Sequence, residues 1–343
     1  MTQDRVIRTL LGLCTAVLIF AALHSARSIL APVVFSLFII AIVWPLQSRL
    51  QARVPKLLAL AITVLATLAV ITLLASLLVW GFSRIGQWLI SNAARFQMLY
   101  MQATDWLDSH GISIAGQMTE SFNMSWLIRA VQEIGGRLHG SISFAIVTLV
   151  FAVLGLLEVD VVRRNIARLK SKEMAQSLLQ AGTDIAAKFQ KYMLVRSVMS
   201  VLTGAVVWGI TLLAGLELAT AWGVIAFVLN YIPFIGPLFA TVFPTLFAIA
   251  QFESWQLALI VFLCLNLIQF LIGSYLEPRI AGAALAVSPF LILFAVFFWS
   301  FLWGIPGAFI GVPIVIALLT VCEQHESTRW VPMLLSGRDD KPA

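Results

Sequence analysis

Polar side chains are rare in the apolar runs of this sequence, and several of them share a helical spacing. One helix face would carry, in order, Asn266, Gln269 or Phe270, Gly273 and Glu277. Amides at such positions can exchange hydrogen bonds with a polar solute, and a carboxylate can bind a cation or a proton. The stripe therefore predicts a lining for the path of a small polar solute or a cation.

Glu277 and Arg279 belong to the short motif EPRIAG, which separates two apolar runs. Pro278 disfavours helical backbone at the residue before it, so we expect Glu277 to be extended and the helix to end there. Both charges could anchor this turn at the membrane interface. Alternatively, they could stand at the mouth of a substrate path, with Glu277 as a proton or cation site.

Asn230 is an amide inside another apolar run, close to Pro233 and Gly236. It could satisfy backbone groups that a helix break leaves free, or offer donors and acceptors to a polar solute, and the two roles can coexist. The candidates for a substrate path are therefore Asn230, Pro233, Gly236, Asn266, Gln269, Glu277 and Arg279.

The sequence lacks the residue patterns of common catalytic centres. There is no paired histidine at metal-ligand spacing, no Gly-x-Ser-x-Gly motif, no phosphate-binding loop and no intramembrane pair of aspartates. The histidines all lie at or outside the ends of apolar runs. We expect neither an enzyme nor a bound cofactor or metal.

Two unusually long uncharged stretches must position the polar residues. The first, between Glu217 and Glu253, would span ~52 Å as one straight helix, whereas a bilayer core is only ~30 Å thick. The second, between Arg279 and Glu323, is longer still. Glycines and prolines near both midpoints predict helix breaks at Pro233, Gly236, Pro237, Gly304, Pro306, Gly307, Gly311 and Pro313.

These interruptions predict two helical hairpins inside the membrane, with two single tilted crossings as the alternative. A matched pair of Gly/Pro-interrupted segments is also the pattern that marks the binding site of many transporters. If both stretches are hairpins, the full crossing before the first hairpin and the full crossing before the second run in opposite directions through the membrane. The C-terminal half would then be an inverted repeat.

The composition is that of a membrane protein. Of 343 residues, 61% are hydrophobic and 11% are charged, whereas soluble domains carry about 25% charged residues. We predict an all-α polytopic protein with about six full transmembrane helices plus two interrupted hairpins, or eight transmembrane segments. The net charge of +6 comes from basic residues clustered in loops, so nucleic acid is not an expected partner.

Charge bias predicts the orientation of the chain in the membrane. Basic residues outnumber acidic ones most strongly in 158–196, which predicts that this region and both termini are cytoplasmic. We divide the chain into N-terminal transmembrane helices 1–83, an extracytoplasmic amphipathic helical region 84–140, a transmembrane helix 141–157, a basic cytoplasmic helical region 158–196, a transport core 197–322 and a cytoplasmic tail 323–343.

Four phrases in the C-terminal half carry a family resemblance: LTGAVVWG (202–209), WGVIAFVLNYIPFIGP (222–237), LEPRIAG (276–282) and GIPGAFIGVPI (304–314). With them, the sequence resembles the autoinducer-2 exporter (AI-2E) family of bacterial inner-membrane transporters, and the N-terminal half resembles the family in layout. The resemblance implies a bacterial inner membrane location, export of small signalling molecules or other solutes, and homopentamers. Some relatives are assigned cation/proton antiport.

The leading hypothesis is a secondary transporter, embedded in membrane lipid, that exports a small polar solute. The autoinducer-2 quorum-sensing signal is one candidate cargo. One alternative is a sodium or lithium/proton antiporter in which Glu277 titrates. A second alternative is a nontransporting membrane scaffold that acts through residues 84–140.

Overall fold

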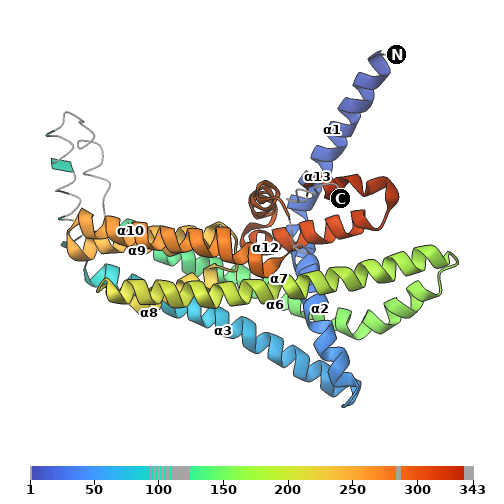
Figure 1. Cartoon of the computed structure of the whole chain (residues 1–343), viewed down its shortest axis with the longest axis horizontal. Coiled ribbons are helices and arrows are strands. Elements are labelled where there is room, and N and C mark those ends of the chain that lie inside the picture. Colours follow the sequence, from blue (N-terminus) through green and yellow to red (C-terminus); the bar gives the residue numbers. More distant parts are fainter. Residues whose placement is uncertain are drawn as a thin grey trace. The chain divides into compact units, whose positions relative to one another are not determined.

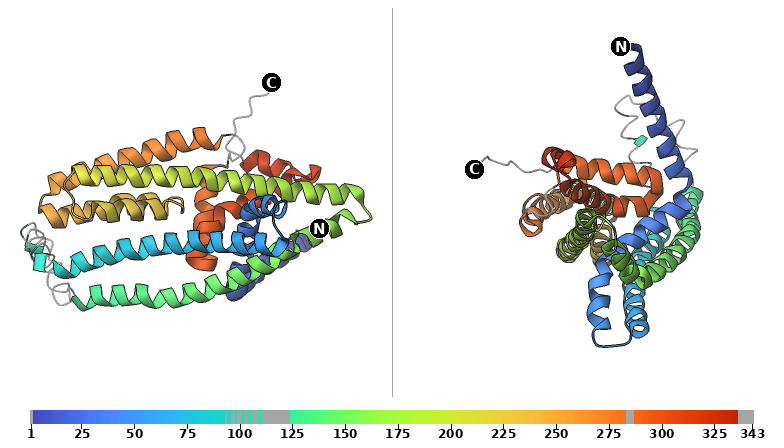
Figure 2. Two further views of the ribbon diagram at one scale, coloured as in Figure 1. Left: turned by 90° about the horizontal axis from the view of Figure 1, so that it is seen from below. Right: turned by 90° about the vertical axis from the view of Figure 1, so that its right-hand side faces the viewer.

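The chain is described by a computed structural model that covers the backbone of residues 2–92, 94–95, 98, 101, 104–105, 109, 124–282 and 287–335. Within these residues every regular element is a helix (Figure 1 and Figure 2). The prediction of an all-α fold is therefore confirmed. Residues 110–123 and several residues between 93 and 108, all in the amphipathic region predicted at 84–140, lie outside the described residues.

Eight described helical segments are long and apolar enough to cross a membrane. They correspond to α1 (Thr2–Ser25), α2 (Arg27–Gln51), α3 (Lys56–Ser91), α6 (Met124–Ala167), α7 (Lys172–Leu213), α9 (Ile235–Phe252), α10 (Trp255–Phe270) with its continuation to Ala281, and α12 (Pro289–Glu323). The shorter elements are α8 (Ala219–Leu229), η1 (Leu271–Leu276), α11 (Glu277–Ala281), η3 (Glu326–Thr328) and α13 (Trp330–Leu335). The chain is a multi-pass membrane protein.

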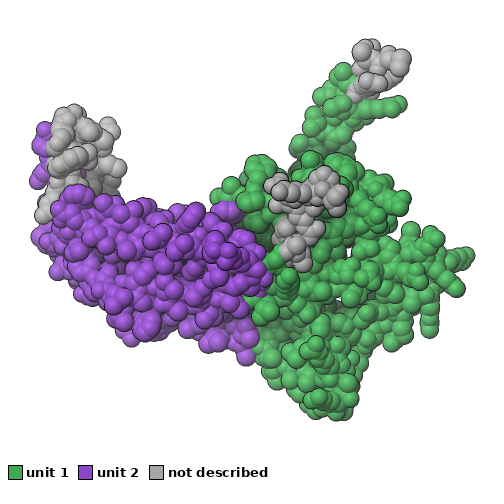
Figure 3. Space-filling view, in the orientation of Figure 1, with its two compact units in different colours: residues 1–67, 143–194, 281–343 green, residues 68–142, 195–280 purple. Residues whose placement is uncertain are grey.

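Two compact sets of residues make up the chain (Figure 3). Unit 1 holds residues 1–67, 143–194 and 281–343, and unit 2 holds residues 68–142 and 195–280. The helices α3, α6 and α7 each begin in one unit and end in the other. The six regions predicted from the sequence follow membrane topology, which this division does not test.

Helix α7 is longer than its apolar part. We expected a basic helical region to end at Arg196 and a separate span to begin at Ser197, but one helix of 42 residues runs from Lys172 to Leu213. No proline interrupts it, and alanine, leucine, glutamine and lysine favour helix throughout its first half. At ~1.5 Å per residue it reaches ~63 Å, so about half of it must lie outside a ~30 Å hydrocarbon core.

The first interrupted stretch is a helical hairpin within unit 2. Its arms are α8 and α9, and the connection between them includes Phe234, whose φ of 63° no regular helix has. A Cβ on Gly236 would collide with the backbone carbonyl of Leu229, so the chain folds back tightly there. Trp222 and Phe247, one on each arm, lie 5.3 Å apart between ring centroids, as antiparallel arms require.

Helix α10 packs beside this hairpin and completes the core of unit 2. It lies alongside α9 in Figure 1, to which it connects through only two residues, Glu253 and Ser254. The Ser254 hydroxyl accepts a hydrogen bond from the Leu257 N–H and caps α10. The core of unit 2 is formed by Trp88, Val207, Leu216, Trp222, Ala226, Ala240, Phe247, Ala248, Ala250, Ala258, Val261 and Leu265.

The second interrupted stretch, α12, is a hairpin within unit 1 and appears folded back on itself in Figure 2. The only non-helical backbone inside it is at Gly304, with φ 68° and ψ −146°. Gly307 lies against the carbonyl of Trp299, and Gly311 lies against that of Ala295, which is antiparallel pairing. Both long stretches therefore fold back, and this geometry excludes two single tilted crossings.

The residues predicted as helix breaks lie in different parts of the two hairpins. Pro233 lies in the first connection, and Gly304 forms the second. By contrast, Gly307, Gly311 and Pro313 lie within helical backbone and are not breaks. The two glycines instead let the arms approach closely, because any larger side chain would meet backbone atoms of the facing arm.

Gly236 and Pro237 fall in the first turn of α9, and Pro306 falls just after Gly304. Proline at these positions costs no hydrogen bond, because the first N–H groups of a helix have no acceptor within it. The predicted inverted repeat stays a prediction, since one hairpin belongs to unit 2 and the other to unit 1.

Candidate functional site

Helix α7 carries buried polar side chains into unit 2. Arg196, Ser200 and Thr203 follow one another at intervals of four and three, so they share one face of the helix. All three are buried, whereas Val201 on the opposite side is exposed. Buried polar groups in an apolar bundle require partners. The hairpin provides one for Ser200 and α11 provides one for Arg196, whereas the Thr203 hydroxyl has no hydrogen-bond partner among the described residues.

The connection between α8 and α9 binds to this face of α7. The amide of Asn230, only 4% exposed, donates a hydrogen bond to the Ser200 hydroxyl at 3.3 Å. The Tyr231 hydroxyl donates to the Ser197 hydroxyl, one turn away, at 3.0 Å. The broken helix is thus attached to α7 by side chains.

Arg196 forms an ion pair with Glu277 of α11. The guanidinium Nη2 lies 3.1 Å from Oε1, and Nη1 lies 3.4 Å from Oε2, so each nitrogen faces one oxygen of the carboxylate. The side chain of Arg196 is 8% exposed and that of Glu277 is 25% exposed. Such paired contacts are the strongest and most directional that a carboxylate makes with a side chain.

Sequence reasoning missed Arg196, because we counted it with the basic cytoplasmic region. The sequence did contain a signal. Arg196 lies one helical turn before Ser200, so the two share one face of the helix. Recognising α7 as one continuous helix would have placed the guanidinium beside the polar residues of the break.

The backbone at Glu277 is helical, with φ −58° and ψ −49°, so our expectation of extended backbone there was wrong. A π-helical turn, η1, comes immediately before it, and the Glu277 N–H bonds to the Ile272 carbonyl five residues back. This wider turn accommodates Pro278, whose ring would clash with a carbonyl in a regular α-helix. The helix ends at Ala281, and Gly282, which follows it, has a φ of +63°.

Other predicted path residues have different surroundings. Asn266 donates its amide to the Phe262 carbonyl of its own helix at 2.9 Å. The guanidinium of Arg279 lies 4.0 Å from the ring centroid of Tyr275, and both side chains are exposed. Gly273 has nothing within 4 Å of an added Cβ. The structure therefore does not gather the predicted stripe into one lining.

Gln269 lies on α10, which runs antiparallel to α9 from a two-residue connection, so its position is level with the first turn of α9. Its Nε2 is buried and has no hydrogen-bond partner among the described residues. An unpartnered buried donor is costly and therefore rare. Gln269 thus brings an available donor to the level of the break.

We name the residues that α7, the hairpin connection and α11 bring together the break cluster. They are Arg196, Ser197, Ser200, Asn230, Tyr231 and Glu277, and all belong to unit 2. Pro233 and Gly236 form the tight turn that holds Asn230 and Tyr231 in place. The break cluster combines hydroxyl, amide and ionic groups at an interrupted helix inside an apolar bundle.

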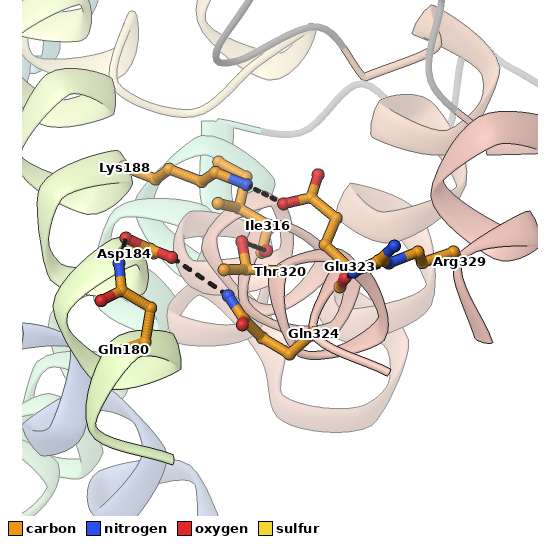
Figure 4. Close-up of polar contacts among 8 residues, drawn as sticks. All are labelled: Gln180, Asp184, Lys188, Ile316, Thr320, Glu323, Gln324 and Arg329. Atoms are coloured by element: carbon orange, nitrogen blue, oxygen red, sulfur yellow. Dashed lines mark hydrogen bonds and ion pairs between the residues drawn. The ribbon is translucent and has the colours of Figure 1, made fainter. Parts of the chain in front are cut away.

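A second polar cluster lies in unit 1, between the basic half of α7 and the end of α12 (Figure 4). Lys188 Nζ lies 2.7 Å from Glu323 Oε2, and the Gln324 amide donates to Asp184 at 3.1 Å. Lys188 is 21% exposed and Glu323 is 49% exposed. Partly exposed pairs of this kind contribute little stability, and we regard them as a tether between two elements.

Within the described part of the chain, no three His, Cys, Asp or Glu side chains are grouped so that they could hold a metal ion. The acidic group of the break cluster, Glu277, is bound to an arginine instead.

A helical multi-pass architecture with a polar cluster at an interrupted helix defines a membrane protein of the transporter class. Residues 13–326 match the family model described as AI-2E family transporter. The chain therefore belongs to the AI-2E family of transporters, as its resemblance implied.

Curated relatives carry transport names. The chain is 26% identical to the AI-2 transport protein TqsA of Escherichia coli (strain K12), over 93% of both chains. It is 26% identical, over 97% of both chains, to a protein of Haemophilus influenzae with the provisional name of transport protein. A similarly named protein of Borreliella burgdorferi is 32% identical over 62% of this chain and 58% of its own.

Proposed function

We propose that this transporter exports small polar solutes across the bacterial inner membrane, and that the path passes the break cluster. Autoinducer-2 is one candidate cargo, since the relative TqsA is named as an AI-2 transport protein. The observation that carries the proposal is the attachment of the interrupted helix to buried polar residues of α7. Transporters commonly build substrate sites from irregular backbone of this kind.

The charge of the break cluster favours an uncharged solute. Arg196 is permanently protonated, and it neutralises Glu277 at 3.1 Å. The remaining groups are hydroxyls and an amide, which can both donate and accept hydrogen bonds. This balance supports transport of a neutral polar molecule over a sodium or lithium/proton antiporter in which Glu277 titrates.

The orientation and assembly are part of the same proposal. Basic residues in 158–196 support a cytoplasmic location for the loop between α6 and α7 and for both termini. The six sequence regions then describe the order of membrane and aqueous segments. Family resemblance supports a homopentamer surrounded by lipid, in which each chain acts without catalysis.

Reconstitution into liposomes tests the proposal. Purified protein is incorporated, and the flux of candidate neutral solutes and of cations is followed under imposed proton and sodium gradients. We expect flux of at least one small polar solute, and we expect no exchange of sodium for protons. Exchange of sodium for protons without any solute flux would contradict the proposal.

Matched variants locate the path. Ser200→Ala removes the hydroxyl that accepts from Asn230, and Ser48→Ala removes an exposed hydroxyl in unit 1 that bonds only to its own helix. We expect Ser200→Ala to reduce flux about tenfold, which corresponds to roughly one hydrogen bond. Ser48→Ala should transport normally, and equal flux in both variants would remove the break cluster from the path.

A further inference from the structure

We propose that Arg196 is a tethered cation: its guanidinium occupies the position beside Glu277 that a coupling sodium ion would otherwise take. The inference rests on the proposed function, and it adds that this chain needs no sodium because its own side chain supplies the positive charge. Arg196 would then determine ion dependence and would not be a substrate ligand.

The geometry supports a fixed occupant. Each terminal nitrogen of Arg196 lies within 3.4 Å of one carboxylate oxygen of Glu277, and the arginine side chain is nearly buried. A guanidinium does not lose its proton in proteins, so Glu277 has a positive partner at every physiological pH. No exchangeable cation is required to compensate the carboxylate.

The surroundings would suit a sodium ion if the guanidinium were absent. Ser197 directly follows Arg196 on α7, and Ser200 lies one turn beyond Arg196. The interrupted helix lies against both hydroxyls through Tyr231 and Asn230. Hard cations prefer oxygen ligands, and unwound helices commonly supply them in sodium-coupled transporters. The nearest other charge along the chain, Arg279, stacks on Tyr275 instead.

Removal of the tethered charge should therefore create a sodium site. In Arg196→Gln, Glu277 loses its partner, and a sodium ion that binds the folded protein should stabilise it. We measure thermal unfolding of the purified full-length protein in detergent, with sodium chloride against choline chloride at equal concentration and pH. The expected result is an increase in Tm of about 2 °C or more in sodium for Arg196→Gln and no increase for the natural protein.

Two further variants distinguish sodium binding beside Glu277 from a general effect of sodium on the stability of the protein. Arg196→Lys keeps a positive charge on α7 and should not respond to sodium. The double variant Arg196→Gln/Glu277→Gln lacks the carboxylate and should not respond either. The inference is overturned if Arg196→Gln shows no sodium response, or if the natural protein responds equally.

Arg196→Gln could fold poorly because it leaves a carboxylate without a partner in a low-dielectric site. Its yield is then compared after purification in sodium and in choline. Recovery in sodium alone supports the inference, and failure in both salts overturns it. Because unfolding is measured without any flux, the result is independent of whether the transport proposal holds.

Discussion

At the scale of single residues, the ion pair between Arg196 and Glu277 is the feature that organises the break cluster. Its two partners come from α7 and α11, which are separated by the whole hairpin and α10 in the sequence. A nearly buried guanidinium needs a counter-charge, because an unpaired ion in a low-dielectric site is strongly unfavourable. The pair therefore holds α11 against α7.

This leads to a stability prediction. Glu277→Gln leaves Arg196 buried without its counter-charge, and we expect a loss of about 3 kcal/mol in the free energy of unfolding. The double variant Arg196→Gln/Glu277→Gln removes both charges and should lose less than the single variant. Unfolding in detergent, followed by circular dichroism, measures both, and a double-variant loss equal to or larger than the single-variant loss would contradict the pairing.

The sequence revealed only part of the site, for a physical reason. Asn230 and Glu277 were recognisable because polar groups are rare in apolar runs. Arg196 was overlooked, because we assigned it to a basic segment, in which a charge looks the same whether it faces water or a carboxylate. The pairing depends on contacts between distant elements, which residue spacing within one helix does not specify.

At the scale of elements, the two hairpins depend on glycines that meet backbone atoms. In α8 and α9, Gly236 lies against Leu229 and Asn230, and in α12, Gly307 lies against Trp299. Backbone atoms cannot move aside as a flexible side chain can. The close approach at each hairpin therefore tolerates no Cβ.

A pair of glycine variants tests this requirement within unit 2. Gly236→Ala should destabilise the protein by about 2 kcal/mol or more and reduce flux, because its Cβ would overlap the Leu229 carbonyl and displace Asn230. Gly273→Ala, which has open space around the added Cβ, should be neutral or up to about 1 kcal/mol stabilising. Thermal unfolding in detergent compares them, and equal stability of both variants would count against the tight hairpin.

Length and break residues favoured two hairpins, since a run of ~52 Å exceeds one bilayer crossing, but they left two single tilted crossings as an alternative. The sequence could not separate the glycine that breaks the second helix from those that pack its arms. Gly304, Gly307 and Gly311 cannot be told apart in the sequence, but in the structure Gly304 alone of the three has a positive φ. The π-helical turn before Glu277 could not be predicted either, because it is defined by which carbonyl each N–H bonds to, and residue types do not specify this.

At the scale of the whole molecule, orientation follows from the charge of the aqueous segments. The loop between α6 and α7 and its flanking turns are rich in lysine and arginine, which favours the cytoplasmic side. Reporter fusions test this directly. A fluorescent protein fused after Ala343 should mature, and an alkaline phosphatase fused at the same position should stay inactive; an active phosphatase would reverse the orientation.

The central claim is that the break cluster lines the path of the solute, and cysteine reactivity tests it most directly. Ser200→Cys and Val201→Cys are made in a variant without Cys14, Cys264 and Cys322, so that a buried residue of α7 is compared with its exposed neighbour. We expect a water-soluble methanethiosulfonate reagent to label Ser200→Cys during transport and to block flux, while Val201→Cys stays unlabelled in lipid. Labelling of Val201→Cys with no reaction at Ser200→Cys would contradict it.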